Sequence, residues 1–453
     1  MEKNELFESM PIKKAVMKMS MPLMTSMLVT VVYNMADTFF IGQTGDSNQV
    51  AAVSLTAPVF MLLMALSNVF GMGGASLISR TLGAKNEEKV KKISSFCFYS
   101  SVILGLICIL VLNLGMEPIL KLLGTSNQTK SFCKEYLFYY LCGAPFVLCS
   151  FTLGNLLRSE GSSKEAMVGN MLGTFINIIL DPIMILMMGM GIRGAAVATV
   201  TGNAAAVTYF IMCIIKKSKV LSLSIKDFEI DKEIIEEIMV VGVPASINNI
   251  LMSVSYIFIN NYLKGYGDSA IAAMGIANKV VSLITLLLVG FAGGSQPIMG
   301  YSYGAKNKER LSELLRFLIK TAVIGGILGG AVIFVFANNI VKVFIDDVEI
   351  INYGTAMLRA LIISAPAVGV ILVLSNLFQA MGKGTQSMIL AVGRQGLIFI
   401  PILAIMSKAS GLNGTILAQA TTDVLTAVLS VNMFVSVKRK ENITSDKNLK
   451  LEV

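Results

Sequence analysis

The sequence predicts an all-α polytopic membrane protein with twelve transmembrane helices arranged as two parallel six-helix repeats. Hydrophobic residues make up 55% of the chain and charged residues only 14%, and the mean hydropathy is +0.73. A soluble protein carries about 25% charged residues and interrupts its apolar runs with polar faces. Here long apolar runs recur from one end of the chain to the other, and features of the first half return in the second.

Twelve segments are apolar and long enough to cross a membrane, since about 20 helical residues span a hydrocarbon core of about 30 Å. The predicted spans are 19–42, 50–79, 93–114, 132–157, 166–189, 194–215, 237–263, 270–301, 317–337, 355–380, 386–407 and 413–437. The first span lacks a small-residue cleavage site, so we expect no cleavable signal sequence.

Lys and Arg residues predict the orientation of these spans. Segments on the N-terminal side of the membrane hold 26 basic residues, and segments on the opposite side hold 6. Basic residues accumulate on the cytoplasmic side of membrane proteins. We therefore expect a multi-pass protein of the cell membrane with both termini in the cytoplasm.

Composition also limits the chemistry that the protein can perform. The net charge is +9, but the basic residues lie between spans, which argues against nucleic acid as a partner. The six Cys residues have no metal-binding spacing, and with no His in the chain the usual zinc and imidazole chemistries are excluded. The sequence therefore predicts neither an enzyme nor a bound cofactor.

The two halves of the chain repeat each other at a nearly constant offset. The matched features are Ser20–Pro22 with Gly242–Pro244, Gly45-Asp46 with Gly267-Asp268, Ala51-Ala52 with Ala272-Ala273, Gly73-Gly74 with Gly293-Gly294, Gly83–Asn86 with Gly304–Asn307, Ala144-Pro145 with Ala365-Pro366, Asn155-Leu156 with Asn376-Leu377, and Gly191 and Gly194 with Gly411 and Gly414. Each half has an even number of spans, so the repeat is parallel, as in many secondary transporters. The predicted parts are an N-lobe (1–215), a cytoplasmic linker (216–236), a C-lobe (237–437) and a cytoplasmic tail (438–453).

Prolines inside the spans are candidate hinges, because each removes a backbone hydrogen bond and can bend its helix. Pro22 with Pro244 and Pro145 with Pro366 occupy equivalent places in the two halves, and Pro182 follows an acidic residue in span 5. Prolines are also common in membrane helices generally. The pairing between repeats favours hinges at Pro22 and Pro244 and at Pro145 and Pro366, and Pro182 is a further candidate hinge.

Acidic residues inside the first-half spans are the main candidates for function. Asn177 and Asp181 lie one turn apart on span 5 and share a face of the helix. Counted from the outer ends of their spans, Asp37, Asp181 and Thr199 lie at depths of about 7, 12 and 7 Å. Their oxygens suit a small cation such as Na⁺, and the two acids crowded in a low dielectric could bind H⁺ instead. The alternative is a polar network that only fixes helix packing.

The second half has a different set of charges. Its spans 7 and 10 carry no acid in their interior, whereas Lys279, Arg394 and Asp423 lie near mid-membrane on spans 8, 11 and 12. A neutralised cluster that joins these helices is the simplest interpretation. A role in coupling is the alternative.

The sequence resembles the multidrug and toxic compound extrusion (MATE) family over nearly its whole length. The matching features are P22-L-M, N34-M-A-D37-T-F-F-I-G42, G83-A-K-N86, N177-I-I-L-D181-P182 and G191-I-R-G-A-A-V-A-T199. The resemblance implies two lobes around a central V-shaped cavity and export of hydrophobic, usually cationic compounds in exchange for Na⁺ or H⁺.

The resemblance also implies which residues bind the coupling ion. These are Asp37, Asn177, Asp181 and Thr199, with a tyrosine of span 4, Tyr136 or Tyr139, nearby and Asn34 as a further support. They would be metal ligands only if the ion is Na⁺. Some members carry acids in spans 7 and 10, and the absence of those acids here argues against a second carboxylate site in the C-lobe. The expected partners are small-molecule drugs and the lipid bilayer, and the expected state is a monomer.

Three other functions fit the sequence less well. A flippase for lipid-linked saccharides or other lipids shares this architecture but would need a cavity lined with Arg and Lys, and the first-half spans hold essentially none beyond Lys134 near the end of span 4. A channel would show a charged ring or filter. An intramembrane enzyme would need a nucleophile–base pair.

Overall fold

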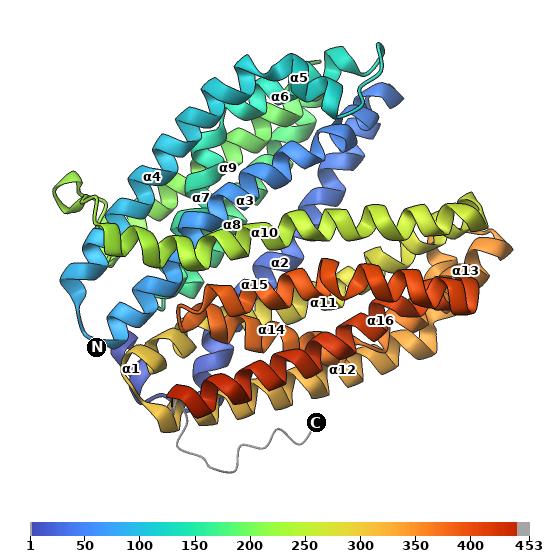
Figure 1. Cartoon of the computed structure of the whole chain (residues 1–453). Coiled ribbons are helices and arrows are strands. Elements are labelled where there is room, and N and C mark those ends of the chain that lie inside the picture. Colours follow the sequence, from blue (N-terminus) through green and yellow to red (C-terminus); the bar gives the residue numbers. More distant parts are fainter. Residues whose placement is uncertain (1, 442–453) are drawn as a thin grey trace. The chain divides into compact units, whose positions relative to one another are not determined.

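The computed structural model describes residues 2–441 (Figure 1). The regular secondary structure within this range is entirely helical. The helices form two compact units, which are described separately. The N-unit contains Thr25–Ser246, and the C-unit contains Met1–Met24 together with Ile247–Val453.

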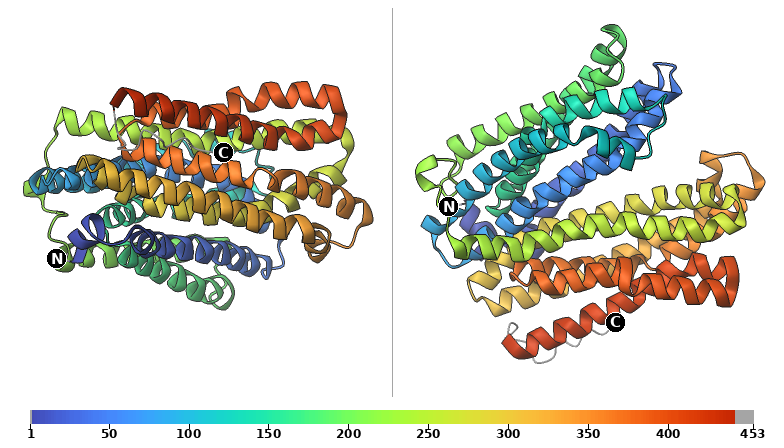
Figure 2. Two further views of the ribbon diagram at one scale, coloured as in Figure 1. Left: turned by 90° about the horizontal axis from the view of Figure 1, so that it is seen from below. Right: turned by 45° about the horizontal axis from the view of Figure 1, so that its top comes forward.

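The helices of the N-unit are the C-terminal part of α2 (Ile12–Gly42), α3 (Ser47–Gly83), α4 (Glu87–Leu114), α5 (Met116–Leu122), α6 (Lys130–Cys142), α7 (Ala144–Ser159), α8 (Ser163–Asp181), the π-helical η1 (Pro182–Met187), α9 (Ile192–Lys217), the 3₁₀ turn η2 (Ile225–Asp227) and the first part of α10 (Lys232–Leu263). Within this unit α7 packs against α3, α4 and α9, and α8 packs against α9. Figure 2 shows these helices (blue to green) running alongside one another.

The helices of the C-unit are α1 (Glu2–Glu8), the first part of α2, the remainder of α10, the 3₁₀ turn η3 (Lys264–Tyr266), α11 (Asp268–Gly304), α12 (Lys308–Phe344), α13 (Val348–Ile362), α14 (Ala365–Ala380), α15 (Gly384–Val392), the π-helical η4 (Gly393–Leu397) and α16 (Phe399–Glu441). Here α14 packs against α11, α12 and α16, which repeats the arrangement around α7. Gly411, which has a φ of 56°, breaks α16 into two helical segments.

The helices account for the twelve predicted spans. Within residues 2–441, eight helical stretches are apolar and long enough to cross a membrane, and two bent helix pairs, α6 with α7 and α13 with α14, pass the same test as single spans. One of the eight stretches, Gly384–Lys440, holds two predicted spans on either side of Gly411. The 32-residue helix α10 covers the remaining predicted span, 237–263.

Spans 4 and 10 are broken at equivalent places. The bends are 54° between α6 and α7 and 45° between α13 and α14. Pro145 and Pro366 stand at the second residue of α7 and α14, where a missing N–H costs nothing. A Cβ on Gly105 would lie 2.5 Å from Cα of Pro145, and a Cβ on Gly326 would lie 2.8 Å from Cα of Pro366. The same glycine–proline contact therefore shapes both halves.

The repeated segment Gly-Ala-Lys-Asn forms a tight turn between two long helices. Lys85 and Lys306 adopt left-handed φ values of 60° and 55°. Asn86 then caps α4 by accepting a hydrogen bond from the backbone N–H of Lys89 (3.0 Å), and Asn307 caps α12 through Arg310 in the same way (3.0 Å). Asn is among the best N-capping residues, so this motif has a structural explanation.

Helices α2 and α10 each pass from one unit to the other. The change occurs after Met24 in α2 and after Ser246 in α10, two residues beyond Pro22 and Pro244. The predicted lobe boundaries, 1–215 and 237–437, follow the sequence repeat, whereas the compact units exchange the N-terminal parts of these two helices. Each unit thus contains the start of the first span of the other repeat.

Polar contacts hold these exchanged ends in place. In the N-unit Arg80 forms an ion pair with Glu237 of α10 (2.8 Å) and Lys89 pairs with Glu233 (2.9 Å). The repeat-equivalent positions in the C-unit are Tyr301 and Arg310. Tyr301 donates to Glu8 (2.7 Å) and its ring stacks on Phe7, and Arg310 donates to the carbonyls of Leu6 and Met10.

Close packing of α10 against α3 predicts a strong effect of enlarging Gly242. A Cβ at this position would lie 2.1 Å from the carbonyl oxygen of Val69, which is backbone and cannot move aside. We expect Gly242→Val to lower the stability of the folded protein by at least about 1–3 kcal/mol, the usual cost of overpacking. The thermal unfolding midpoint of the purified protein measures this change.

The matched control is Gly325→Val, in the middle of α12. A Cβ there meets nothing within 4 Å, and the residue is exposed. Both substitutions place the same β-branched residue in a helix, so a similar shift in the two variants would contradict the packing argument.

Candidate cation site in the N-unit

The structure brings the four predicted ligand residues together inside the N-unit. Asp37 lies in the C-terminal part of α2, Asn177 and Asp181 lie in the last turns of α8, and Thr199 lies in α9. All four are buried, with exposed fractions of 8%, 3%, 0% and 5% respectively. One polar cluster is therefore supplied by the neighbouring helices α8 and α9 and by α2, which is far from them in the sequence.

Two glycines allow α8 and α9 to approach closely enough for this cluster. A Cβ on Gly173 would lie 2.7 Å from the carbonyl oxygen of Gly202, and a Cβ on Gly202 would lie 2.5 Å from that of Gly173. Small residues at helix contacts in membranes permit such backbone approach. Asn177, one turn after Gly173, then lies beside Thr199.

The end of α8 is fixed by Pro182. Proline has no N–H to donate to the carbonyl four residues earlier, and the chain changes at Pro182 to the π-helical turn η1. Such turns are often found at functional sites. As a result Asp181, the last residue of α8, is completely buried next to an irregular segment.

Asn177 has two possible amide orientations. In one, Nδ2 donates to Oγ1 of Thr199 (3.3 Å). In the other, Nδ2 donates to Oδ2 of Asp181 (3.3 Å) and Oδ1 accepts from the backbone N–H of Thr199 (2.9 Å). We assign the second orientation, because it gives both amide atoms a partner. Asn177 then links Asp181 to α9.

Each of the two carboxylates keeps one oxygen without a partner. Oδ1 of Asp37 and Oδ1 of Asp181 are both buried and accept no hydrogen bond from any described residue. No described Lys or Arg pairs with either acid, and the two carboxylates lie close enough to repel each other. A buried carboxylate without a partner is costly. This arrangement is suited to binding a small cation or a proton.

Tyr33 belongs to the same cluster and was not predicted from the sequence. Its hydroxyl lies 3.3 Å from Oγ1 of Thr199. The spacing contained the signal, because Tyr33 and Asp37 are four residues apart and share one face of α2. The side chain of Asn34, which was predicted as a support, lies outside the described residues.

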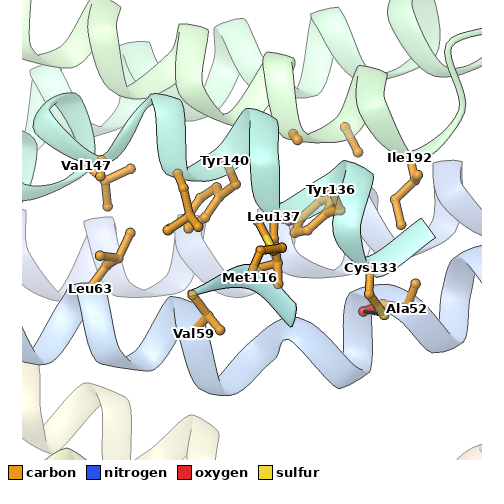
Figure 3. Close-up of a cluster of buried hydrophobic side chains, with 14 of the residues drawn as sticks. Ala52, Val59, Leu63, Met116, Cys133, Tyr136, Leu137, Tyr140, Val147 and Ile192 are labelled. Carbon is orange, nitrogen blue, oxygen red and sulfur yellow. Dashed lines mark hydrogen bonds between the residues drawn. The ribbon is translucent and has the colours of Figure 1, made fainter. Parts of the chain in front are cut away.

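Of the two predicted tyrosines of span 4, Tyr136 is near the cluster and Tyr139 faces elsewhere. Tyr136 is buried, interacts electrostatically with Asp37 and stacks on Tyr140, with ring centroids 6.1 Å apart. Figure 3 shows both rings within an apolar core that also contains Val59 and Leu63 of α3. Tyr139 instead lines an open cavity of about 390 Å³ together with Lys134 and Glu135.

Among its described residues, the C-unit has no equivalent of this carboxylate site. Under the spacing that relates Pro22 to Pro244, Asp37 corresponds to Ile259, which is buried and apolar. The structure does bring together two of the three predicted charged residues, because Nε of Arg394 contacts Oδ1 of Asp423 at 2.7 Å. Lys279 is exposed and pairs with no described acid.

Comparisons with known proteins point to one family. A sequence model of the MatE family matches residues 22–183 and again residues 244–405. The second match begins and ends at the positions equivalent to those of the first, which confirms the predicted internal repeat. Together the two matches cover most of the chain.

Two curated relatives are similar over nearly their whole length. The multidrug export protein MepA of Staphylococcus saprophyticus is 34% identical over 446 residues, which are 98% of each chain. MepA of Staphylococcus aureus strain NCTC 8325 is 34% identical over 440 residues, 97% of each chain.

Solved structures share the fold. An outward-facing multidrug resistance MATE family transporter of the MOP superfamily aligns with a TM-score of 0.91 and 26% identity, over 97% of this chain and 99% of that one. A MOP superfamily transporter from Pyrococcus furiosus aligns with a TM-score of 0.90 and 26% identity, over 97% of this chain and 99% of that one. These matches confirm the predicted all-helical fold of twelve spans in two repeats.

Proposed function

This chain belongs to the MatE family of membrane transporters, and from that premise we propose that it is a cation-coupled multidrug efflux antiporter. Its substrates would be hydrophobic, mostly cationic compounds, exported in exchange for H⁺ or Na⁺. The names of the MepA relatives and of the MATE structures support the export of drugs. The observation that supports cation coupling is the pair of buried carboxylates, Asp37 and Asp181, each with an unpartnered oxygen.

The coupling ion would bind between the acids. The free oxygens of Asp37 and Asp181 and the hydroxyl of Thr199 are hard oxygen ligands, which suit Na⁺. A proton shared by the carboxylates would neutralise the same cluster. In both cases Asn177 and Tyr33 act as supports that hold Asp181 and Thr199 in position.

Helix α2 is the element that can carry the effect of this binding. It holds Asp37 and passes between the units two residues after Pro22. Neutralising Asp37 would allow α2 to bend, which would release the drug to the outside and favour return to the inward-facing state. Pro244 in α10 and Pro182 after Asp181 are the further proposed hinges. The protein would be a monomer in the cell membrane, with both termini on the cytoplasmic side.

The test is efflux of a fluorescent cationic dye from proteoliposomes under an imposed Na⁺ gradient or an imposed pH gradient, applied separately. We expect one of the two gradients to raise the initial rate of efflux at least about tenfold above the rate of leakage. A coupling free energy of about 1.4 kcal/mol already corresponds to a factor of ten. Drive by Na⁺ alone would make the oxygens of Asp37, Asp181 and Thr199 a coordination site, and drive by the pH gradient alone would make the two acids a proton site.

Failure of both gradients would contradict the antiporter proposal. The flippase alternative would then be tested with a lipid-linked saccharide in the same vesicles. Empty vesicles and vesicles without a gradient serve as controls for leakage.

A further inference from the structure

Arg394 in the C-unit has an unusual position for a charged residue. It lies in the π-helical turn η4, ten residues after the start of α15, which places it about 15 Å along the span and near mid-membrane. Its side chain is 18% exposed, so it is only partly covered. Intramembrane Arg residues normally face protein or a water-filled cavity, because contact with lipid is costly.

The partner of Arg394 is fully satisfied. Asp423 is 2% exposed, and its Oδ1 accepts from Nε of Arg394 at 2.7 Å and from Gln419 at 3.2 Å. Its Oδ2 accepts from the hydroxyl of Ser364 at 2.8 Å. The carboxylate therefore accepts hydrogen bonds from three donors, and only one of them is an N–H of Arg394.

The rest of the guanidinium group remains available. Arginine has five N–H donors in a planar fork, and no described residue accepts from the two terminal nitrogens of Arg394. The contact through Nε fixes the plane of the group, so the terminal nitrogens form a preoriented edge. Such an edge matches the two oxygens of a carboxylate or phosphate.

Helix packing alone does not explain this ion pair. Under the spacing of the repeat, Arg394 and Asp423 correspond to the segments 172–174 and 201–203, which include Gly173 and Gly202. In the N-unit those two glycines make the contact between α8 and α9 without any charge. The fold can therefore form this contact with small residues, and the charged pair in the C-unit has another use.

We propose that the free edge of Arg394 is an oxyanion subsite that binds the carboxylate of zwitterionic, amphipathic substrates. Asp423, Ser364 and Gln419 hold the guanidinium group in orientation and do not contact the substrate. This inference rests on the proposed transport function and adds a substrate class to it, because the carboxylates of the N-unit by themselves favour cations.

The experiment measures binding to the full-length protein in phosphatidylcholine nanodiscs. The probes are a zwitterionic rhodamine with a free carboxylate and the methyl ester of the same dye, and fluorescence polarisation gives both dissociation constants. We expect the acid to bind at least about tenfold more tightly than the ester, as charge-assisted hydrogen bonds contribute an effect of this size. A ratio near one in the unmodified protein would overturn the proposal.

Variants connect the preference to the guanidinium group. Arg394→Lys keeps a cation for Asp423 but loses the fork, and Arg394→Gln with Asp423→Asn replaces the pair by neutral groups. Both variants are expected to reduce the ratio of the ester's dissociation constant to that of the acid about tenfold. The control variant Lys279→Gln removes an exposed cation from the same unit and should leave this ratio unchanged. An unchanged ratio in both Arg394 variants, or an equal loss in Lys279→Gln, would refute the subsite.

A second arm separates the substrate from lipid as the source of the oxyanion. Nanodiscs with added phosphatidylglycerol should leave the ratio as it is in phosphatidylcholine. If the anionic lipid abolishes the preference for the acid, the guanidinium group holds a lipid phosphate and the substrate assignment is wrong. Because binding needs no gradient, failure of coupled transport would be seen separately in the efflux assay.

Discussion

Replacing Asp37 with Asn is expected to abolish gradient-driven efflux while leaving the protein folded. Asn has nearly the shape of Asp but can neither carry the negative charge nor take up a proton, and Oδ1 of Asp37 has no described partner to lose. We expect the initial efflux rate to fall at least about 100-fold, the factor that corresponds to a loss of about 3 kcal/mol in binding the coupling ion. The dye efflux assay in proteoliposomes measures it.

The control is the same substitution at another aspartate, Asp46→Asn. Asp46 caps α3 by accepting from the backbone N–H of Asn48 (2.9 Å), and Asn caps helices about as well as Asp. Asp46→Asn should therefore export the dye like the unmodified protein. Coupled efflux by Asp37→Asn at a normal rate would show that the coupling ion binds elsewhere.

Removing Asp423 is expected to have the largest effect on stability. Its carboxylate is the charge that compensates Arg394, and Asp423→Ala would leave the guanidinium group uncompensated in the C-unit. Breaking one partner of a buried ion pair costs about 3–5 kcal/mol. The thermal unfolding midpoint of the purified protein should fall by many degrees, and the yield of folded protein should fall with it.

The double variant Arg394→Leu with Asp423→Leu separates the cost of the unpaired charge from the value of the pair. Replacing a whole buried ion pair with apolar residues is often neutral or stabilising by about 1–4 kcal/mol. We therefore expect the double variant to unfold near the temperature of the unmodified protein. A double variant as unstable as Asp423→Ala would mean that the pair itself holds the C-unit together.

The spans and the repeat could be predicted from the sequence because both are recorded locally. A stretch of about 20 apolar residues identifies a span without any knowledge of its neighbours. Equivalent features at a nearly constant offset, such as Gly83–Asn86 and Gly304–Asn307, identify the repeat in the same way, and the two MatE matches confirm it. The pairing of Pro145 with Pro366 favoured bends within spans 4 and 10, and both spans are bent next to these prolines.

The candidate site could be predicted in part. Helical spacing placed Asn177 and Asp181 on one face, and depth along the spans placed Asp37 and Thr199 at compatible heights. Depth says nothing about how a helix is rotated, so it could not distinguish Arg394, which meets Asp423, from Lys279, which is exposed. The same limit left Tyr136 and Tyr139 as alternatives until the structure showed which is buried near Asp37.

By itself the sequence determined the membrane class, the twelve spans, the parallel repeat and the residues that could hold a cation, because hydropathy, spacing and charge are properties of short segments. Only the tertiary structure decided which groups meet. It brought Tyr33 to Thr199, Gly173 to Gly202, and the start of α10 to Arg80. These contacts join residues on different helices, and they depend on the rotation and close approach of those helices, which side-chain packing fixes across the whole unit.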